Sequence, residues 1–401
     1  MLRRAHGARP HQTTEPPRIR PLRRGQRGRT LLGALLLVCG LYLWISSDPA
    51  HVAQAVDLAR TLLGPGSVAQ VETWAFQAQD VLRRAHYQAT GASSGVQWAA
   101  PAATLPPARL ASGRLAHHPE LAAQPAAHTM PIPPTQPAST WSPLLTTADG
   151  QPVLERTSVA PDPSRPYVSV ALVRIDLDSS RLHFVAGTTE PRSSVRVARP
   201  GTIPAVDQRP GYLLAAFNGG FKAINGAYGM AVNGVALLPT KDGLATLALY
   251  RDGSIRLGVW GRDIMPTPDL IAFRQNCPLL LDHGQPTAET EQDSPALWGY
   301  TVRNKVTTWR SGLGVSADGR YLIYAVGDGL TVPTLARALA LGGADRGMQL
   351  DINSFWTRFV IYGSTSDGKE LIAQKLLAPM VGDARQFLAP ESRDFFYVTA
   401  R

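Results

Sequence analysis

Three patterns of hydrophobic and polar residues divide the chain of 401 residues. Residues 30–46 form an uncharged apolar run, long enough for a short membrane-spanning helix. Residues 51–90 are predicted to form juxtamembrane helices, one over 51–63 and one over 67–85. We expect the apolar stripe of the second helix to pack on the main domain, with a second copy of the chain or the bilayer surface as alternatives. Residues 91–140 are rich in proline and alanine, which predicts a disordered linker. From residue 141, short apolar runs alternate with turn residues, which predicts a globular domain over 141–401.

Most elements predicted within residues 141–401 are strands. One clear helix is expected at 332–341, closed by two glycines. Many strands with few helices predict an α+β domain built on a largely antiparallel or mixed β-sheet. The predicted strands are 167–176, 182–186, 212–217, 231–238, 244–250, 254–260, 312–315, 321–326, 348–352, 359–362 and 395–398.

The net charge of +10 is concentrated near the beginning of the sequence. Residues 1–29 contain many arginines and a single acid, Glu15. Arginines before an apolar run keep that end in the cytoplasm, so we expect a basic cytoplasmic tail over 1–29 and an uncleaved signal anchor over 30–46. A cleaved signal peptide is the alternative. Either reading places the domain outside the cytoplasm, and the anchor reading places the protein in the cell membrane. Because the charge lies in a tail, we expect no nucleic-acid partner.

The two cysteines, Cys39 and Cys277, exclude a disulfide scaffold and a four-cysteine zinc site. Cys39 lies inside the apolar run, so a bond to Cys277 is not expected, and Cys277 is predicted to be a buried thiol. No spacing of histidines and carboxylates requires a metal ion. We therefore expect neither a metal nor a cofactor, while the oligomeric state stays open.

Two segments place polar side chains beside predicted strands. Asn218 ends a strand and is followed by Gly219 and Gly220. Asparagine can hydrogen-bond sugar hydroxyls or phosphoryl oxygens, and glycines allow close approach of a ligand, although an Asn-Gly turn fits equally well. Arg310 precedes a strand of small residues, where its guanidinium could bind a phosphate with two hydrogen bonds. A solvent-facing strand arginine is the alternative.

A third segment begins with Asp351, which ends a short apolar strand. A carboxylate at this position could act as a general acid, a general base or a nucleophile if burial tunes its pKa. The alternative is a turn that closes the strand. Asp328 is a further catalytic candidate. The substrate-binding candidates are Asn218, Gly219, Gly220, Asn353, Ser354 and Trp356.

Taken in order, these segments resemble the phosphodiester glycosidase family. This family includes the lysosomal uncovering enzyme, which removes N-acetylglucosamine from mannose-6-phosphate diesters. The resemblance runs across residues 168–361 and implies a hydrolase that cleaves a bond between a sugar and a phosphodiester. The matching stretches are 218–221, 229–234, 277–284, 310–314, 318–319, 328–331, 332–344 and 350–351.

The sequence after Asp351 departs from the family, whose members usually have a glycine-rich, serine-containing stretch there. The bulky residues Ile352, Phe355 and Trp356 occupy that stretch here and would reshape the site. We predict a membrane-anchored extracytoplasmic hydrolase of a sugar-1-phosphodiester bond in a cell-envelope glycan or glycolipid. Asp351 would perform the chemistry, Arg310 would hold the phosphate and Asn218 would orient the sugar. The alternative is a non-catalytic glycan- or envelope-binding domain that uses aromatic stacking.

Overall fold

The computed structural model describes residues 78, 80–91, 93, 95–99, 140–292, 295–299 and 307–401. The predicted tail, the signal anchor at 30–46, the predicted helix at 51–63, the beginning of the one at 67–85 and most of the predicted linker lie outside the described residues. Within those described ranges, every helix is too short or too polar to cross a membrane.

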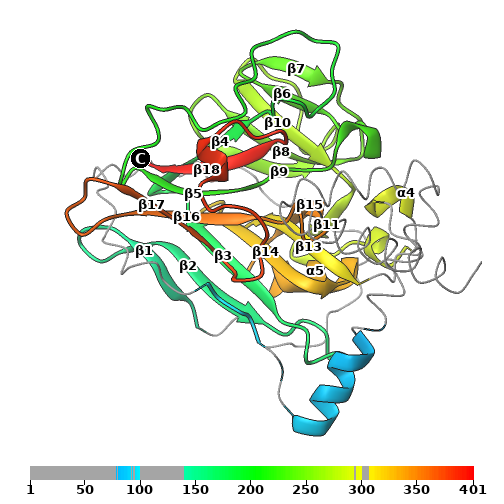
Figure 1. Ribbon diagram of the computed structural model, residues 1–401. Helices are drawn as coiled ribbons and strands as arrows, with labels where there is room; N and C mark the ends of the chain where they lie inside the picture. Colours follow the sequence, from blue (N-terminus) through cyan, green and yellow to red (C-terminus); the bar gives the residue numbers. More distant parts are fainter. Residues whose placement is uncertain are drawn as a thin grey trace, which may run out of the picture. The chain divides into compact units, whose positions relative to one another are not determined.

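Sheets dominate the described domain, as the sequence predicts (Figure 1). Every strand ladder recorded between the named strands is antiparallel. The largest sheet has eight strands in the order β1-β2-β3-β14-β13-β15-β11-β12. Its strands are β1 (Ser142–Thr146), β2 (Pro152–Val159), β3 (Val170–Asp176), β14 (Tyr321–Leu330), β13 (Thr308–Val315), β15 (Arg346–Ile352), β11 (Leu279–Asp282) and β12 (Gln285–Pro286).

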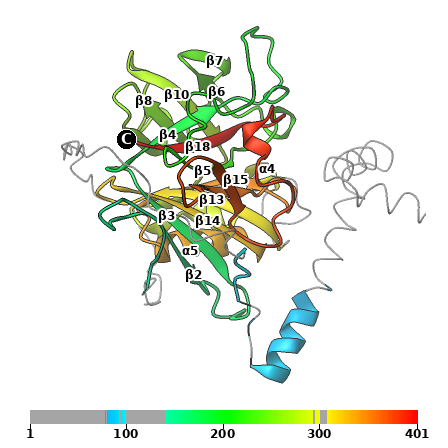
Figure 2. The ribbon, with the colours of Figure 1, turned by 60° about the vertical axis from the view of Figure 1, so that its left-hand side comes forward.

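Two five-stranded sheets complete the framework, in the orders β17-β16-β5-β18-β4 and β7-β6-β10-β8-β9. In Figures 1 and 2, the sheet that contains β5 and β18 lies between the other two. The first sheet consists of β17 (Leu371–Lys375), β16 (Phe359–Ser364), β5 (Leu213–Asn218), β18 (Phe395–Ala400) and β4 (Ser180–Val185). The second consists of β7 (Val235–Leu238), β6 (Met230–Val232), β10 (Leu270–Asn276), β8 (Ala245–Tyr250) and β9 (Ile255–Val259).

Several predicted strands differ in extent, and one of them is divided in two. The sequence pattern predicts a single strand over 231–238, but the structure divides it into β6 and β7. Asn233 and Gly234 between them have φ angles of 51° and 77°, in the left-handed region. Asparagine and glycine adopt that region most readily, so the pair forms a tight hairpin turn instead of continuing the strand.

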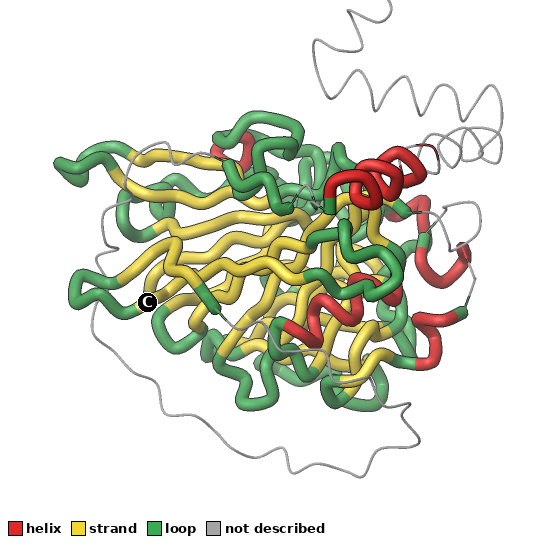
Figure 3. Tube along the Cα trace, turned by 90° about the horizontal axis from the view of Figure 1, so that it is seen from below, coloured by secondary structure: helices red, strands yellow, loops and turns green. Residues whose placement is uncertain are grey.

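Helices are few and short in the described residues, as Figure 3 shows. Helix α5 (Val332–Leu341) forms where the sequence predicts it, because Thr331 caps its first turn and accepts the N–H of Thr334. The helix buries Leu335 and Leu339 against the eight-stranded sheet at Gly312 of β13. A Cβ atom at Gly312 would lie 3.2 Å from both leucines, so the missing side chain lets the helix approach closely. The other short helices are η1 (Ala223–Asn225), η2 (Ala288–Glu291), α4 (Pro295–Trp298) and η3 (Gln386–Leu388).

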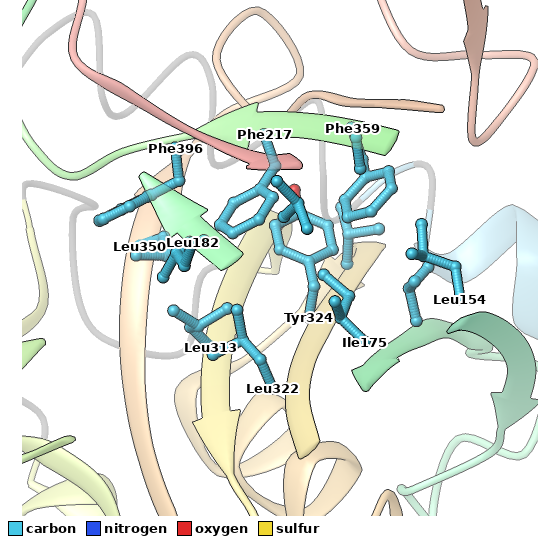
Figure 4. Packing of buried hydrophobic residues seen from close by; sticks show 14 of the residues in the cluster. Leu154, Ile175, Leu182, Phe217, Leu313, Leu322, Tyr324, Leu350, Phe359 and Phe396 are labelled. Atoms are coloured by element: carbon cyan, nitrogen blue, oxygen red, sulfur yellow. The ribbon is translucent and has the colours of Figure 1, made fainter. Parts of the chain in front are cut away.

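The main core lies between the eight-stranded sheet and the sheet that contains β5. Figure 4 shows Phe217 of β5 and Phe359 of β16 beside Tyr324 of β14. The rings of Phe217 and Phe359 stack with centroids 5.6 Å apart, and each lies within 5.2 Å of the Tyr324 ring centroid. Full burial of a large apolar side chain contributes roughly 1.5–3 kcal/mol. This packing therefore holds the strand ends that carry the candidate site.

The N-terminal helical region docks through its polar face rather than its apolar stripe. Residues 80–90 are helical. Asp80 accepts a hydrogen bond from Tyr167 at 3.2 Å, and Arg83 pairs with Asp328. Val81 and Leu82, which belong to the stripe expected to pack inward, are 65% and 70% exposed. The domain offers charged partners at this surface, so the polar face binds it.

Part of the predicted linker also contacts the domain. Trp98 forms an antiparallel bridge with Leu377, and the N–H of Ala99 donates to the carbonyl of Leu376 at 3.1 Å. The guanidinium of Arg156 lies 4.6 Å from the centroid of the Trp98 ring. Residues 95–99 are therefore ordered on the domain, although they belong to the stretch predicted to be a disordered linker.

Candidate active site

A pocket of about 280 Å³, counting the open solvent at its mouth, lies where β5 and β15 end and β18 begins, between the eight-stranded sheet and the sheet that contains β5. Strand β5 contributes its last residue, β15 contributes the carboxylate near its end, and the segment between η3 and β18 forms the remaining wall. The pocket is lined by Asn218, Gly219, Asp351, Trp356, Arg358, Phe387, Glu391, Arg393 and Asp394. Four of the sequence-predicted site residues are thus brought together.

Asp351 is the carboxylate at the base of this pocket, and it is 6% exposed. Its Oδ1 accepts the N–H of Ile352 at 2.8 Å, and its Oδ2 accepts a hydrogen bond from the guanidinium of Arg393. Its backbone N–H donates to the carbonyl of Gly219 at 3.1 Å, which ties β15 to the end of β5. Burial raises the pKa of Asp351, and the charge of Arg393 offsets part of this effect. The carboxyl group is therefore better able to hold a proton than an exposed aspartate.

Arg393 forms the cationic side of the pocket. Its Nη2 donates to Asp351 and to the carbonyl oxygen of Gly220 at 3.0 Å. Its Nε is buried and has no hydrogen-bond partner among the described residues. The guanidinium lies 4.6 Å from the centroid of the Trp356 ring, a favourable cation–π geometry. A guanidinium with an unused donor beside a pocket is well suited to bind an anion.

A second ion pair lies directly behind the pocket wall. Arg274 of β10 donates from Nε to Oδ2 of Asp394 at 2.8 Å, and both side chains are 1% exposed. Asp394 also accepts the N–H of Gly220 at 3.0 Å. A Cβ atom at Gly219 would lie 2.0 Å from Oδ2 of Asp394, and one at Gly220 would lie 3.0 Å from the Arg274 guanidinium. Residues 219 and 220 must therefore be glycines, because their backbone runs directly against the Arg274–Asp394 ion pair.

Asn218 joins several elements at the pocket floor. Its Oδ1 accepts the N–H of Arg358 at 3.0 Å and the hydroxyl of Tyr324 at 2.9 Å. Its Nδ2 donates to the hydroxyl of Ser311 and to the carbonyl of Gly219, each at 3.0 Å. An asparagine amide offers two acceptor and two donor positions, and all four are used within the protein. This arrangement fits a positioning role better than the predicted contact with a sugar.

Among the described residues, three cationic side chains lie near the ring of Trp356. Arg393 is nearest, the ammonium of Lys222 lies 5.2 Å from the ring centroid, and the guanidinium of Arg358 lies 5.9 Å from it. Arg358 donates to the side chain of Gln386 and lies 3.4 Å from Oε2 of Glu391. The bulky residue that departs from the family pattern therefore collects positive charge at the pocket.

Two predicted catalytic residues do not line this pocket. Arg310 is 0% exposed; it donates to the carbonyl of Leu330 at 3.1 Å and to Oε1 of Gln349 at 2.8 Å. Burial lowers the pKa of Arg310 to about 10. Asp328 instead pairs with Arg83 of the N-terminal helix. The cation beside Asp351 is therefore Arg393, and Arg310 is a buried member of the eight-stranded sheet.

Three further predicted binding residues lie close to the pocket in the chain without being among its lining residues. Asn353 has a φ angle of 84°, and its Oδ1 accepts the N–H of Phe355 at 3.2 Å and the hydroxyl of Ser354 at 3.4 Å. Asn353 therefore builds the turn that presents Trp356. Gly220 contributes its carbonyl to Arg393 rather than lining the pocket.

Sequence reasoning missed the wall formed by residues 387–394. This wall supplies Glu391, Arg393 and Asp394. The charged run 391–394 comes directly before the apolar strand β18. We searched for polar side chains where predicted strands end, and the same search where strands begin would have found this run. Within the described ranges, no group of three or more histidine, cysteine or acidic side chains could hold a metal ion.

Cys277 is a buried free thiol, as predicted. Its sulfur lies 3.8 Å from the hydroxyl of Tyr228 and 3.6 Å from Nε2 of Gln349. Burial raises the pKa of Cys277 to about 12, so the thiol stays protonated at neutral pH.

Comparison with known proteins gives one match to a family model. The model is described as phosphodiester glycosidase and matches residues 212–351, which include Asn218, Gly219 and Asp351 of the pocket. No curated protein matches the chain.

Two solved structures illustrate the similarity. The catalytic domain of zebrafish N-acetylglucosamine-1-phosphodiester alpha-N-acetylglucosaminidase, auto-inhibited by its pro-peptide, matches at 17% identity with a TM-score of 0.40. That match covers 63% of this chain and 84% of the zebrafish chain. A hypothetical protein from Synechocystis matches at 15% identity with a TM-score of 0.31, covering 58% of this chain and 59% of the other. The family match confirms the predicted resemblance: residues 212–351 carry the sequence pattern of the phosphodiester glycosidase family.

Proposed function

We propose that this protein is a hydrolase that cleaves the bond between a sugar anomeric carbon and a phosphodiester. One observation carries the proposal: within the pocket, the buried carboxyl group of Asp351 contacts the guanidinium of Arg393. Asp351 is also the last residue of the segment that matches the family model. A carboxyl group and a cation at one pocket are the minimum that this reaction needs, because one moves a proton and the other binds the phosphate.

In this proposal, Arg393 holds the phosphodiester. Its guanidinium already lies at the pocket wall, and its buried Nε has no partner among the described residues, so an anionic oxygen could accept that hydrogen bond. Arg358 and Lys222, around the same Trp356 ring, add positive charge nearby. Charge-assisted hydrogen bonds of this kind are about twice as strong as neutral ones. Arg393 thus takes the role that the sequence suggested for Arg310.

Asp351 is proposed to hold or donate a proton at the oxygen that links the sugar to the phosphate. Burial raises its pKa, which favours a protonated carboxyl group. A phosphate monoester has a second pKa of about 6, so it leaves a sugar readily. The transition state then resembles an oxocarbenium ion, and protonation by Asp351 need supply only part of the stabilisation. The remaining part would come from Arg393 in a site shielded from water.

The location and the substrate source are part of the proposal. The apolar run at 30–46, preceded by arginines, supports a single-pass cell-membrane protein with a cytoplasmic N-terminus and an extracytoplasmic domain. An exported, membrane-bound hydrolase would meet sugar phosphodiesters in the glycans or glycolipids of the cell envelope. We therefore propose such a polymer or lipid as the substrate.

A non-catalytic glycan-binding domain is the competing function. It was suggested by the bulky residues that follow Asp351, with Trp356 as a stacking surface for sugars. The Trp356 ring, however, has the guanidinium of Arg393 at 4.6 Å and Lys222 at 5.2 Å. Side chains thus already occupy positions where a sugar would stack, so the arrangement favours an anionic ligand over a neutral glycan.

The decisive experiment measures sugar release from UDP-N-acetylglucosamine, and from a panel of other sugar-1-phosphodiesters, by the full-length protein in detergent. The full chain is required because the helix at residues 80–90 and the segment 95–99 contact the domain. Asp351→Asn is compared with Asp367→Asn, a change in the exposed turn between β16 and β17. We expect turnover by the wild type and the control, and about a 100-fold loss in Asp351→Asn. Saturable glycan binding without any turnover would instead establish the binding function.

A further inference from the structure

We propose that Glu391 is the second catalytic carboxylate of this pocket, and that it acts as the base that activates the attacking water. This inference rests on the proposed hydrolase function. It adds a residue that lies outside the segment matched by the family model, which ends at residue 351.

The first argument is elimination among the acidic groups of the pocket. Glycosidases with an oxocarbenium-like transition state usually need two carboxyl groups, one for the leaving oxygen and one for the nucleophile. The described acidic residues that line the pocket are Asp351, Glu391 and Asp394. Asp394 is 1% exposed at its side chain and is bound to Arg274 and to the N–H of Gly220, so it cannot reach a substrate. Glu391 is left as the partner of Asp351.

The second argument is the position of the Glu391 side chain. Its exposed fraction of 15% is larger than the 9% of Asp351, so water can reach it. Its Oε1 accepts the N–H of Ser392 at 2.8 Å, and its Oε2 lies 3.4 Å from Nη1 of Arg358. These contacts fix the carboxylate at the pocket wall. The N–H and hydroxyl of Ser392 and the N–H of Arg393 all contact Oε1, whereas Oε2 has the longer contact with Arg358, so the acceptor capacity that remains for a water lies on Oε2.

The backbone on either side holds Glu391 in place. Its N–H donates to the carbonyl of Gly201 at 2.7 Å, and its carbonyl accepts the N–H of Thr188 at 2.9 Å. Gly201 has a φ angle of 63°, and a Cβ atom there would lie 2.4 Å from the carbonyl oxygen of Glu391. The segment 188–201 therefore clamps the residue with a contact that only glycine allows. A rigid frame of this kind is what a catalytic side chain requires.

The two carboxylates are linked through Arg393. The guanidinium of Arg393 contacts Asp351, while its backbone N–H lies 3.4 Å from Oε1 of Glu391. A phosphodiester held by this guanidinium would place its sugar within the pocket that both carboxylates line.

The reaction then proceeds with one water as the only co-substrate. Glu391 accepts a proton from that water as its oxygen bonds to the anomeric carbon. The bond from this carbon to the bridging oxygen breaks, and its electron pair leaves with the phosphate, which becomes a monoester. Asp351 donates a hydrogen bond or a proton to the bridging oxygen. The products are the free sugar and the phosphate monoester. The proton on Glu391 returns to solvent, and Asp351 regains from solvent any proton that it gave to the bridging oxygen.

The test uses the full-length protein with UDP-N-acetylglucosamine, or the panel diester that the wild type hydrolyses fastest. Glu391→Gln keeps the size of the side chain and one of its two acceptor oxygens but cannot take the proton, so we expect about a 100-fold loss of turnover. Glu370→Gln, in the exposed turn before β17, is the matched control and should keep wild-type turnover. Thermal melting of both variants should match the wild type.

A second measurement separates chemistry from structure. Azide is already an anion and needs no base, so it should restore turnover to Glu391→Ala and yield a glycosyl azide with the opposite anomeric configuration to the substrate. Failure of azide to restore turnover would overturn the role of Glu391, as would turnover of Glu391→Gln within about threefold of the wild type. Absence of turnover by the wild type itself would overturn the hydrolase function, and the role of Glu391 with it.

Discussion

Two consecutive residues, Arg393 and Asp394, form ion pairs of very different character. Asp394 pairs with Arg274, both side chains are 1% exposed, and every nitrogen of the Arg274 guanidinium has an acceptor within the protein. Arg393 pairs with Asp351, and the two side chains are 10% and 9% exposed. Both members of this second pair line the pocket, and the Nε of Arg393 lacks a partner among the described residues.

The difference separates the frame of the site from the part that can bind a ligand. A fully enclosed pair with complete hydrogen bonding has nothing to offer a substrate, but it fixes the backbone around it. The Arg274 guanidinium has no N–H left for a substrate oxygen, because its Nη2 already donates to the carbonyl of Phe221 at 2.6 Å. The pocket pair keeps unused hydrogen-bonding capacity and a carboxyl group with a raised pKa, which are features of functional sites.

The largest expected effect tests whether the enclosed pair is the structural one. Arg274→Met should lower the free energy of unfolding by about 3–5 kcal/mol, because it leaves the Asp394 carboxylate buried without its counter-ion. Arg393→Met should cost clearly less, because the carboxyl group of Asp351 can take up a proton. Urea denaturation of the two variants measures this difference. Equal losses would remove the distinction between the two pairs.

The next effect tests the pocket pair. Asp351→Asn should reduce turnover about 100-fold, which corresponds to about 2.7 kcal/mol of transition-state stabilisation, while the protein stays folded. Steady-state kinetics and circular dichroism on the same samples measure both properties. A loss of turnover that merely followed a loss of folded protein would assign Asp351 to the frame instead.

The pH dependence of stability gives an independent check on the same residue. The pKa of Asp351 is raised in the folded state, so its contribution to stability is present at low pH and is lost as the pH rises through that pKa. Asparagine has no such dependence. The wild type should therefore gain stability relative to Asp351→Asn as the pH is lowered toward the ordinary carboxyl range.

The strand framework was predictable because most strands alternate or bury apolar side chains, as 213–217 and 359–362 do. Strands β1, β2, β10, β11, β12 and β17 were not predicted, and β10 was missed because its last three residues are polar. Arg274, Gln275 and Asn276 are each no more than 1% exposed and hydrogen-bonded within the protein, for example Asn276 to the carbonyl of Gln349 at 2.8 Å. A hydrophobicity pattern cannot show that a polar run is buried, since its partners lie far away in the sequence.

The candidate site was predictable only on one side. Asn218 and Asp351 stand out because each follows an apolar strand. Arg393 enters the site only because β18 pairs with β5, which places Phe395 opposite Asn218. That register joins residues far apart in the chain, so the charged run before β18 could mark Arg393 as a candidate but could not show that it meets Asp351. Arg310 misled the prediction for the same reason: the local pattern does not reveal that its side chain is buried and donates to Leu330 of β14 and Gln349 of β15.

A further prediction concerns the sheet that carries Arg393 and Asp394 into the core. His183 of β4 stacks on Tyr397 of β18 with ring centroids 4.5 Å apart, and burial lowers its pKa to about 4. Its folded pKa is below the unfolded value of 6.5, so stability is present above pH 6.5 and is lost as the pH falls toward 4. Between pH 7 and pH 5 the loss should be about 2 kcal/mol.

The variant His183→Gln should remove this loss, whereas His86→Gln, a change of an exposed histidine on the N-terminal helix, should leave it in place. Urea midpoints at the two pH values measure both variants. If His183→Gln kept the full acid sensitivity, the sensitivity would have to come from the two ion pairs. Their contributions to stability would then have to be compared at each pH separately.

The smallest effect concerns how firmly the pocket arginine is held. Trp356 lies against Arg393 at 4.6 Å, and a cation–π contact of this type contributes about 0.5–1 kcal/mol at a partly exposed site. Trp356→Leu should therefore raise KM for the phosphodiester by roughly two- to fivefold, with a smaller change in kcat, because Arg393 binds the phosphate less well without the ring. Trp356→Phe, which keeps an aromatic face, should recover most of the affinity. A loss confined to kcat would mean instead that the ring contacts the reacting sugar, and the indole would then belong to the catalytic part of the pocket.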